Sequence, residues 1–176
     1  MVSQLTEAMI VNGVGVATVL SSDLGGARKI GWIRVLRPVL AAAVIVPLYL
    51  KTPATHGTAL AVEIAGLAAG VLGGLVAAAL MKVYRSPASG LPVSSAGWPY
   101  AIFWTTVIGA RAAFSYGAAH WFTAPLVAWC VAHQVSEAAI TDGLIYMAIV
   151  MIIARSAGLR IRASRLPQRE LTPQNA

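Results

Sequence analysis

The sequence predicts an all-α fold, a polytopic bundle of five transmembrane helices with the N-terminus outside and the C-terminus inside. Of its residues 58% are hydrophobic and 11% are charged, with a mean hydropathy of +0.74, whereas soluble domains carry about 25% charged residues. Its apolar stretches reach the length of about 20 residues that crosses a bilayer at about 1.5 Å of rise per residue. Positive charge gathers in alternate connections between these stretches. The sequence therefore indicates a multi-pass protein of the cell membrane.

Five apolar stretches follow one another along the chain, at residues 2–20, 30–50, 57–81, 97–118 and 132–154. The first is the weakest, because Gln4, Glu7 and Asn12 interrupt it. Pro47 is expected to kink the second near its outer end. Each stretch is predicted to be one membrane-spanning helix.

The connection between the fourth and fifth stretches allows three structures. Residues 120–125 contain His, Trp and Phe, which are typical of the membrane interface. Residues 125–131 fit an interfacial half-helix, a re-entrant segment or an extension of the fifth helix. We expect residues 1–156 to form a single transmembrane domain and residues 157–176 to form a basic polar cytoplasmic tail that is partly disordered.

The Lys and Arg residues assign the two sides of the membrane. Eleven of them fall on one side of the predicted topology, and the opposite side holds only Lys51. The eleven form three clusters: Arg28, Lys29, Arg34 and Arg37; Lys82 and Arg85; and Arg155, Arg160, Arg162, Arg165 and Arg169. Beside apolar spans, such residues favour the cytoplasmic side and anionic lipid headgroups. The net charge of +7 is therefore not interpreted as nucleic-acid binding.

The third stretch carries a stripe of small residues, with Gly66, Gly70 and Gly74 at four-residue spacing. Helices in lipid associate through such residues, because they let two backbones approach closely. We expect a packing face within one chain, with a dimer interface as the alternative. Glu63 lies three positions before Gly66 and shares this face, so it is predicted to point into a helix interface rather than at lipid.

In the third, fourth and fifth predicted spans three charged residues lie well inside, Glu63, Arg111 and Asp142, and Glu137 lies near an end. A charge inside a bilayer is unfavourable by about 2.5–3.5 kcal/mol, so each needs a partner or a function. Glu63 and Arg111 both lie about six residues, or roughly 9 Å, below the outer surface. This matched depth predicts an ion pair, whereas Asp142 lies nearer the midplane.

Two interpretations of these outer-half charges remain open. In the first, Glu63 or Asp142 neutralises Arg111, and the buried pair specifies helix packing. In the second, a polar cavity opens to the outer side, Arg111 binds an anion or carboxylate, and an unpaired acid moves protons. The substrate-binding residues of the second interpretation are Arg111, Trp104, Glu137, Tyr116 and Asn12, with Ser115 and Tyr146 adding hydroxyls.

These interpretations lead to two classes of function. The first is an accessory, binding or transport-type membrane protein whose partners are membrane lipids and a lipophilic small molecule. The alternative is a membrane-embedded enzyme acting on a lipophilic substrate, by analogy with small integral-membrane terpene cyclases. In that enzyme Glu63 or Asp142 is the catalytic acid, and Trp104, Phe114 and Tyr116 shield the cationic intermediate.

The sequence predicts no metal site and no cofactor. His56, His120 and His133 have spacings that match no ligand motif, and the one cysteine, Cys130, excludes a Cys-x-x-Cys site. The pair Gly13 and Gly15 lacks the third glycine of a dinucleotide-binding fingerprint.

Several short motifs suggest a family. They are Arg37-Pro38 at the start of the second stretch, the connection from Ser89-Gly90 to Ala96-Gly97, and Trp104 and Arg111 followed by Phe114 and Tyr116. In these features the chain resembles the CcdC-like family of small polytopic bacterial membrane proteins, found near cytochrome c biogenesis genes in some bacteria. The composition around residues 154–160 is similar to that of actinobacterial proteins. The resemblance implies no reaction and no catalytic residues, because the activity of the family is undefined.

Overall fold

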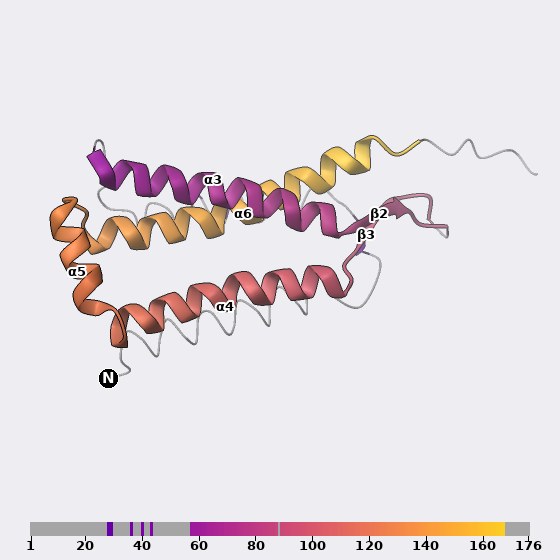
Figure 1. Cartoon of the computed structure of the whole chain (residues 1–176). Coiled ribbons are helices and arrows are strands. Elements are labelled where there is room, and N and C mark those ends of the chain that lie inside the picture. Colours follow the sequence, from indigo (N-terminus) through magenta and orange to yellow (C-terminus); the bar gives the residue numbers. More distant parts are fainter. Residues whose placement is uncertain are drawn as a thin grey trace, which may run out of the picture.

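The computed structural model describes residues 28–29, 36, 40, 43, 57–87 and 89–167. The first two predicted spans lie outside these residues, apart from Leu36, Leu40 and Ala43, which are helical and exposed. In chain order the elements are β1 (Arg28–Lys29), α3 (Gly57–Leu80), β2 (Lys82–Arg85), β3 (Pro92–Ser95), α4 (Trp98–His120), α5 (Thr123–Ala132) and α6 (Glu137–Ser164) (Figure 1).

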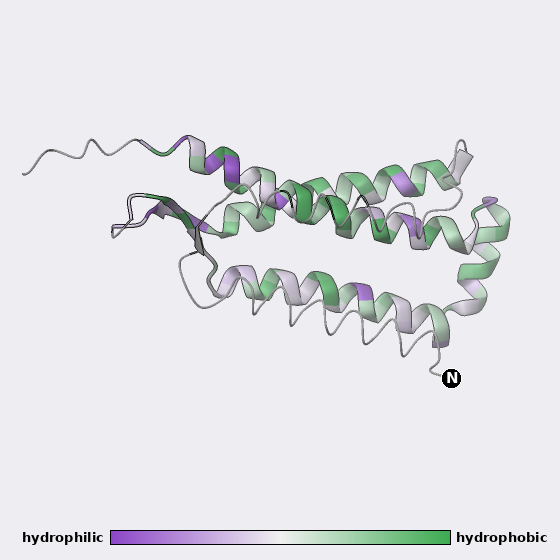
Figure 2. Ribbon diagram, turned by 180° about the vertical axis from the view of Figure 1, so that it is seen from behind, coloured by the Kyte–Doolittle hydropathy of each residue, from purple (hydrophilic) through white to green (hydrophobic). Residues whose placement is uncertain are grey.

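Helices α3 and α6 run side by side in the same direction, and α4 runs back in the opposite direction (Figure 1). Both α3 and α6 are long and apolar enough to cross a membrane, and only 17% of each apolar segment is buried. The core helix of a soluble protein would be mostly buried instead. Figure 2 shows apolar residues along most of α3 and α6, with hydrophilic residues concentrated in the hairpin and the last turns of α6.

The predicted glycine stripe is the contact between α3 and α6, and we call this contact the glycine seam. A Cβ added to Gly70 would lie 2.6 Å from the carbonyl oxygen of Met147, and one added to Gly66 would overlap the carbonyl oxygen of Gly143. A Cβ on Gly74 would overlap the carbonyl oxygen of Met151. The two backbones therefore touch, and the expectation of a packing face within one chain is confirmed for these helices.

A small antiparallel sheet closes one end of the helices, in the strand order β1-β3-β2. Arg28 pairs with Ser94 of β3, and Lys82 of β2 pairs with Ser95. The prediction of an all-α fold is wrong in this respect, since residues 82–95 form a β-hairpin rather than an irregular loop. The hairpin turn is completed by Gly90, whose φ of +64° suits glycine.

The hydrophobic core lies beside this sheet, where α4 begins and α3 ends. Its buried members are Ala77, Ala78, Met81, Tyr100, Trp104, Met151 and Leu159. The rings of Tyr100 and Trp104 pack with their centroids 6.3 Å apart. The tightest packing of α4 against α3 and α6 is therefore at the sheet end.

The connection between α4 and α6 is a separate short helix, α5, which crosses the far end of the molecule (Figure 1). Three alternatives were open for residues 125–131. An extension of the fifth helix is excluded, because the helix is interrupted at Gln134, whose φ of 53° is not helical. A new helix then begins at Glu137, with Ser136 accepting a hydrogen bond from the amide of Ala139 at 3.1 Å.

Helix α6 continues ten residues beyond the predicted end of the fifth span, to Ser164. Residues 157–164 of the predicted tail are therefore helical, and the expected disorder toward the end of the tail falls on residues 168–176, which lie outside the described residues. The reason is that Leu159 and Ala163, four residues apart, are buried on one helix face. The basic residues between them lie on the other faces of a regular helix.

Candidate functional site

Two carboxylates lie close together at the end of the glycine seam where α3 and α6 begin. Glu63 of α3 is 5% exposed and Asp142 of α6 is 7% exposed. Each is next to a seam glycine: Glu63 precedes Gly66 by three residues, and Asp142 directly precedes Gly143. The charge of Glu63 acts on Asp142, and both carboxylates act on the hydroxyl of Tyr146, one turn further along α6. The prediction that Glu63 points into a helix interface is confirmed.

Arg111 is not part of this acidic pair. It lies half-buried in the middle of α4, and no ion pair joins it to Glu63 or Asp142 in the part of the chain that the structure describes. Between α4 and the described parts of α3 and α6, the predicted ion pair of Arg111 with Glu63 is not formed. Glu63 lies six residues after the start of α3 and Arg111 nine residues before the end of α4, and such counting does not fix which way each helix face turns.

A cavity of about 250 Å³ lies between the second half of α4, α5 and the start of α6. Its walls are mainly apolar, with hydroxyls from Ser115, Thr123 and Thr141 and the thiol of Cys130. The hydroxyl of Thr123 donates to the carbonyl oxygen of Ala118 at 2.6 Å, so it joins the start of α5 to the end of α4. This cavity suits an apolar molecule that carries few polar atoms.

A second cavity, of about 260 Å³, lies between α3, α4 and α6. It shares Phe114, Ile140 and Leu144 with the first, so these three side chains lie between or beside both spaces. On the α3 side it is bounded by Ala65 and Ala69, whose small side chains leave room beside the seam. We call the two spaces together the outer-half cavity, because they lie in the half of the helices that the sequence predicts to be the outer one.

The acidic pair and the outer-half cavity lie on different sides of α6. Ile140 and Leu144, which line the cavity, are each two residues from Asp142. Two residues correspond to about 200° around a helix of 3.6 residues per turn, so Asp142 points nearly the opposite way. Neither carboxylate lines either of the two cavities described here.

The other predicted site residues are dispersed. Trp104 is buried in the core at the sheet end, and its indole Nε1 has no hydrogen-bond partner among the described residues. Tyr116 is 39% exposed and stacks on His120, with ring centroids 4.4 Å apart. Glu137 is the first residue of α6, and Asn12 lies outside the described residues. Of the predicted aromatic residues, Phe114 alone lines both parts of the cavity.

Two basic residues have structural roles that the sequence pattern did not predict. Arg162 donates from Nη1 to the carbonyl oxygens of Met81, at 2.8 Å, and Ala78, so it caps the C-terminal end of α3. Arg85 donates from Nε to the carbonyl oxygen of Pro167 at 2.8 Å and from Nη1 to that of Gly90 at 3.0 Å. Arg85 ends a strand and Arg162 lies in the last turn of a helix. Basic residues at such ends often bind backbone carbonyl oxygens, so this placement could have predicted the contacts.

Comparisons of the chain with protein-family models, with curated proteins and with solved structures gave no significant match. Function is therefore inferred from the arrangement of the residues alone.

Proposed function

We propose that the chain is a multi-pass protein of the cell membrane with five spans, residues 2–20 and 30–50 followed by α3, α4 and α6. The N-terminus and α5 lie outside in this topology, and the sheet and the end of α6 lie inside. We also propose that the chain belongs to the CcdC-like membrane proteins. This membership implies no reaction, because the activity of that family is undefined.

The exposed sides of the helices support a membrane environment. Six large apolar side chains of α3 are between 36% and 65% exposed. They are Ile64, Leu67, Val71, Leu72, Leu75 and Val76. Exposure of this much apolar surface to water is unfavourable by about 25 cal/mol per Å². Lipid removes that penalty, and the parallel α3 and α6 with an antiparallel α4 satisfy the alternation that successive spans require.

We propose further that the protein binds a lipophilic small molecule in its outer half. The observation that carries this proposal is the outer-half cavity, because its two parts together fall in the range of about 300–1,000 Å³ typical of small-molecule sites. Ser115 and Thr123 supply hydroxyls for a single polar group on such a ligand. This favours a protein that binds a lipophilic small molecule as a carrier or as an accessory subunit, rather than an enzyme.

The alternative of a membrane-embedded enzyme has less support. An acid catalyst must reach the atom that it protonates, to within about 2.6–3.2 Å or through one water. Glu63 and Asp142 lie away from the cavity side of α6, and Trp104 lies in the core. The proposed enzyme residues are therefore not gathered around the space that would hold the substrate.

The proposal is tested by identifying what copurifies with the protein. The chain is purified in a mild detergent from its membranes, and bound lipophiles are extracted and identified by mass spectrometry. Ala118 lines the cavity, so Ala118→Phe should fill it and abolish copurification. The matched control is Ala119→Phe, one residue further along α4 on an exposed position. Equal recovery of the same lipophile from both variants would contradict the cavity as the binding site.

A further inference from the structure

Arg111 lies on the face of α4 that is turned toward α3 and α6. Trp104 of this face is buried in the hydrophobic core, and Val107 packs against that core one turn later. Arg111 follows Val107 by four residues and Trp104 by seven, which places all three on one side of the helix. Arg111 is accordingly half-buried, whereas Ala110 and Ala113 on either side of it are exposed.

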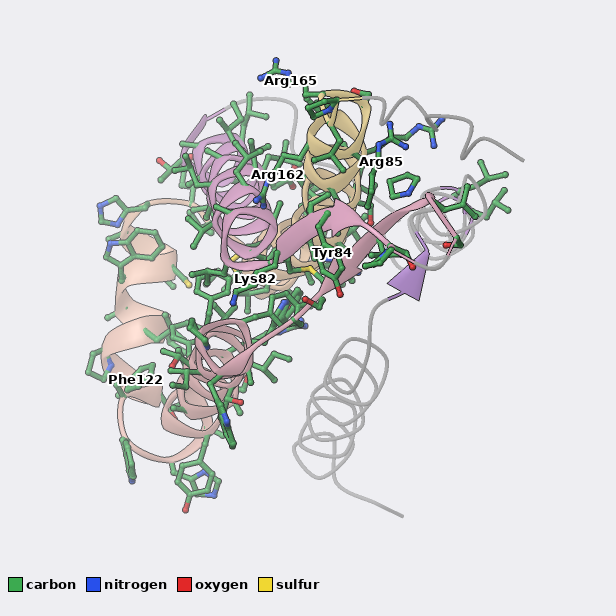
Figure 3. The ribbon with its side chains drawn as sticks, turned by 90° about the vertical axis from the view of Figure 1, so that its right-hand side faces the viewer. Lys82, Tyr84, Arg85, Phe122, Arg162 and Arg165 are labelled. Carbon is green, nitrogen blue, oxygen red and sulfur yellow. The ribbon has the colours of Figure 1, made fainter. Side chains whose placement is uncertain are left out.

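The same face of α4 continues into the outer-half cavity. Phe114 and Ser115 line the cavity three and four residues after Arg111. Side chains of a helix lean back toward its N-terminus, so those of Phe114 and Ser115 lie over the turn that begins at Arg111. The ring of Phe114 packs on that of Phe122 with centroids 5.7 Å apart, and Figure 3 shows Phe122 beside α4 and α5. Arg111 therefore borders the cavity, one turn closer to the sheet.

The guanidinium of Arg111 makes no ion pair and no hydrogen bond within the residues that the structure describes. Glu63 and Asp142, the two carboxylates nearest to it in depth, lie at the glycine seam instead. An arginine inside a bilayer normally pairs with an acid or a carbonyl group, or faces a polar cavity. Of these arrangements, the described residues provide the cavity.

The charge available at this place is that of one arginine. No second Lys or Arg is among the residues that line the two parts of the cavity. One guanidinium neutralises one carboxylate and donates two parallel N–H groups to it. A phosphate monoester carries a charge of about −1.5 to −2 at pH 7 and would keep part of it unpaired. The single arginine therefore favours a carboxylate.

The rest of the cavity suits an unbranched hydrocarbon chain. The part between α3, α4 and α6 has a volume of about 260 Å³ and is lined by apolar side chains and glycines. Ile140 and Leu144 line this part and also the part beside α5, so one chain in contact with them passes from one part to the other. Ser115, one turn from Arg111, adds a hydroxyl that can donate to a carboxylate oxygen.

We propose that the ligand of the outer-half cavity is a single-chain fatty acid whose carboxylate binds Arg111. Its hydrocarbon chain lies along Phe114, Ile140 and Leu144. This inference rests on the cavity proposed above as the binding site and adds the chemical class of the ligand. It gives Arg111 the role of selecting an acid over an uncharged lipophile of the same length.

The test compares two radiolabelled probes that differ only in their polar group, hexadecanoate and hexadecanol. Each is titrated into the full chain, purified in a nonionic detergent. The unmodified chain should bind hexadecanoate about tenfold more tightly or better, as expected of a hydrogen bond to a charged group. Arg111→Gln should abolish this preference by weakening the binding of hexadecanoate while leaving that of hexadecanol unchanged. The matched control is Ala110→Gln on the exposed side of α4, which should keep the preference.

Three results would overturn the inference. They are equal affinities of the unmodified chain for the two probes, an unchanged preference in Arg111→Gln, and an equal weakening of both probes in that variant, which would mean a role in packing alone. Thermal unfolding in detergent shows that each variant is folded.

Ala118→Phe separates this inference from the cavity itself. Filling the cavity should weaken the binding of both probes, whatever their polar group. Undiminished binding of both probes to Ala118→Phe would contradict the cavity as the site. Loss of both probes in Ala118→Phe, together with an unchanged preference in Arg111→Gln, would keep the cavity and contradict only the carboxylate.

Discussion

Gly66 of α3 lies so close to Gly143 of α6 that a Cβ on Gly66 would overlap the carbonyl oxygen of Gly143. The same closeness recurs one turn later, where a Cβ on Gly70 would lie 2.6 Å from the carbonyl oxygen of Met147. Without side chains between them, the two helices gain dispersion contacts along their backbones. The stability of the contact between α3 and α6 therefore depends on glycine at these positions, because even the methyl group of alanine would not fit.

Gly70→Ala should lower the stability of the protein in detergent by about 1–3 kcal/mol, because the added methyl group forces α3 and α6 apart. Thermal unfolding followed by size-exclusion chromatography measures the effect. The matched control is Gly109→Ala in α4, where a Cβ would meet nothing within 4 Å. Alanine there should leave the melting temperature unchanged or raise it, since glycine disfavours a helix by about 0.5–1 kcal/mol. Equal melting temperatures in the two variants would rule out the glycine seam.

Arg162→Gln should also destabilise the protein, because it removes the guanidinium that caps α3 at Met81 and Ala78. Hydrogen bonds to a charged group contribute about 1.5–3 kcal/mol, and the change is read as a lower melting temperature in detergent. The comparison variant is Arg165→Gln, three residues on, whose side chain is exposed. It should melt at the temperature of the unmodified chain, and a loss as large as that of Arg162→Gln would refute the capping role.

Asp142→Asn should leave the fold intact and keep or raise the melting temperature. Asparagine has the size of aspartate and removes the repulsion from Glu63, which acts on Asp142 across the seam. Because Glu63→Gln removes the same repulsion, the two changes should be non-additive in a double-mutant cycle. Arg111→Gln serves as the independent partner, and its effect should add to that of Asp142→Asn within about 0.5 kcal/mol. Strong coupling of Arg111 with Asp142 would restore the ion-pair interpretation.

The proposed topology is open to cysteine labelling in intact cells. Cys130→Ala first removes the native thiol, and single cysteines then replace His120 at the end of α4 or Ser89 in the hairpin, both exposed positions. A membrane-impermeant maleimide added outside should label the cysteine at 120 and should reach the one at 89 only after permeabilisation. Labelling of position 89 in intact cells would invert or exclude the five-span arrangement.

Long periodic helices were the part of the fold that the sequence predicted well. The stretches at residues 57–81 and 97–118 agree within two residues with α3 and α4, because length and apolar content alone define them. The start of α6 was missed, since the break at Gln134 is a single residue of positive φ in an otherwise apolar run. Strands of two and four residues are too short for any periodic signal, so the sheet was missed as well.

The candidate site was predicted in part. Glu63 was placed correctly because its spacing to Gly66 fixes the helix face that it shares. Asp142 could have been placed by the same reasoning from Gly143, its direct neighbour, had that glycine been recognised as part of the contact. The pairing of Arg111 could not be predicted, because the rotation of α4 is set by its packing at Tyr100 and Trp104, far along the helix.

The strand order of the small sheet has a consequence for biosynthesis. β1 and β2 each pair with β3 and not with one another, although both precede β3 in the chain. Neither can find its partner until β3 has left the ribosome, so the sheet forms only after α3 has been synthesised, although β1 precedes α3 in the chain.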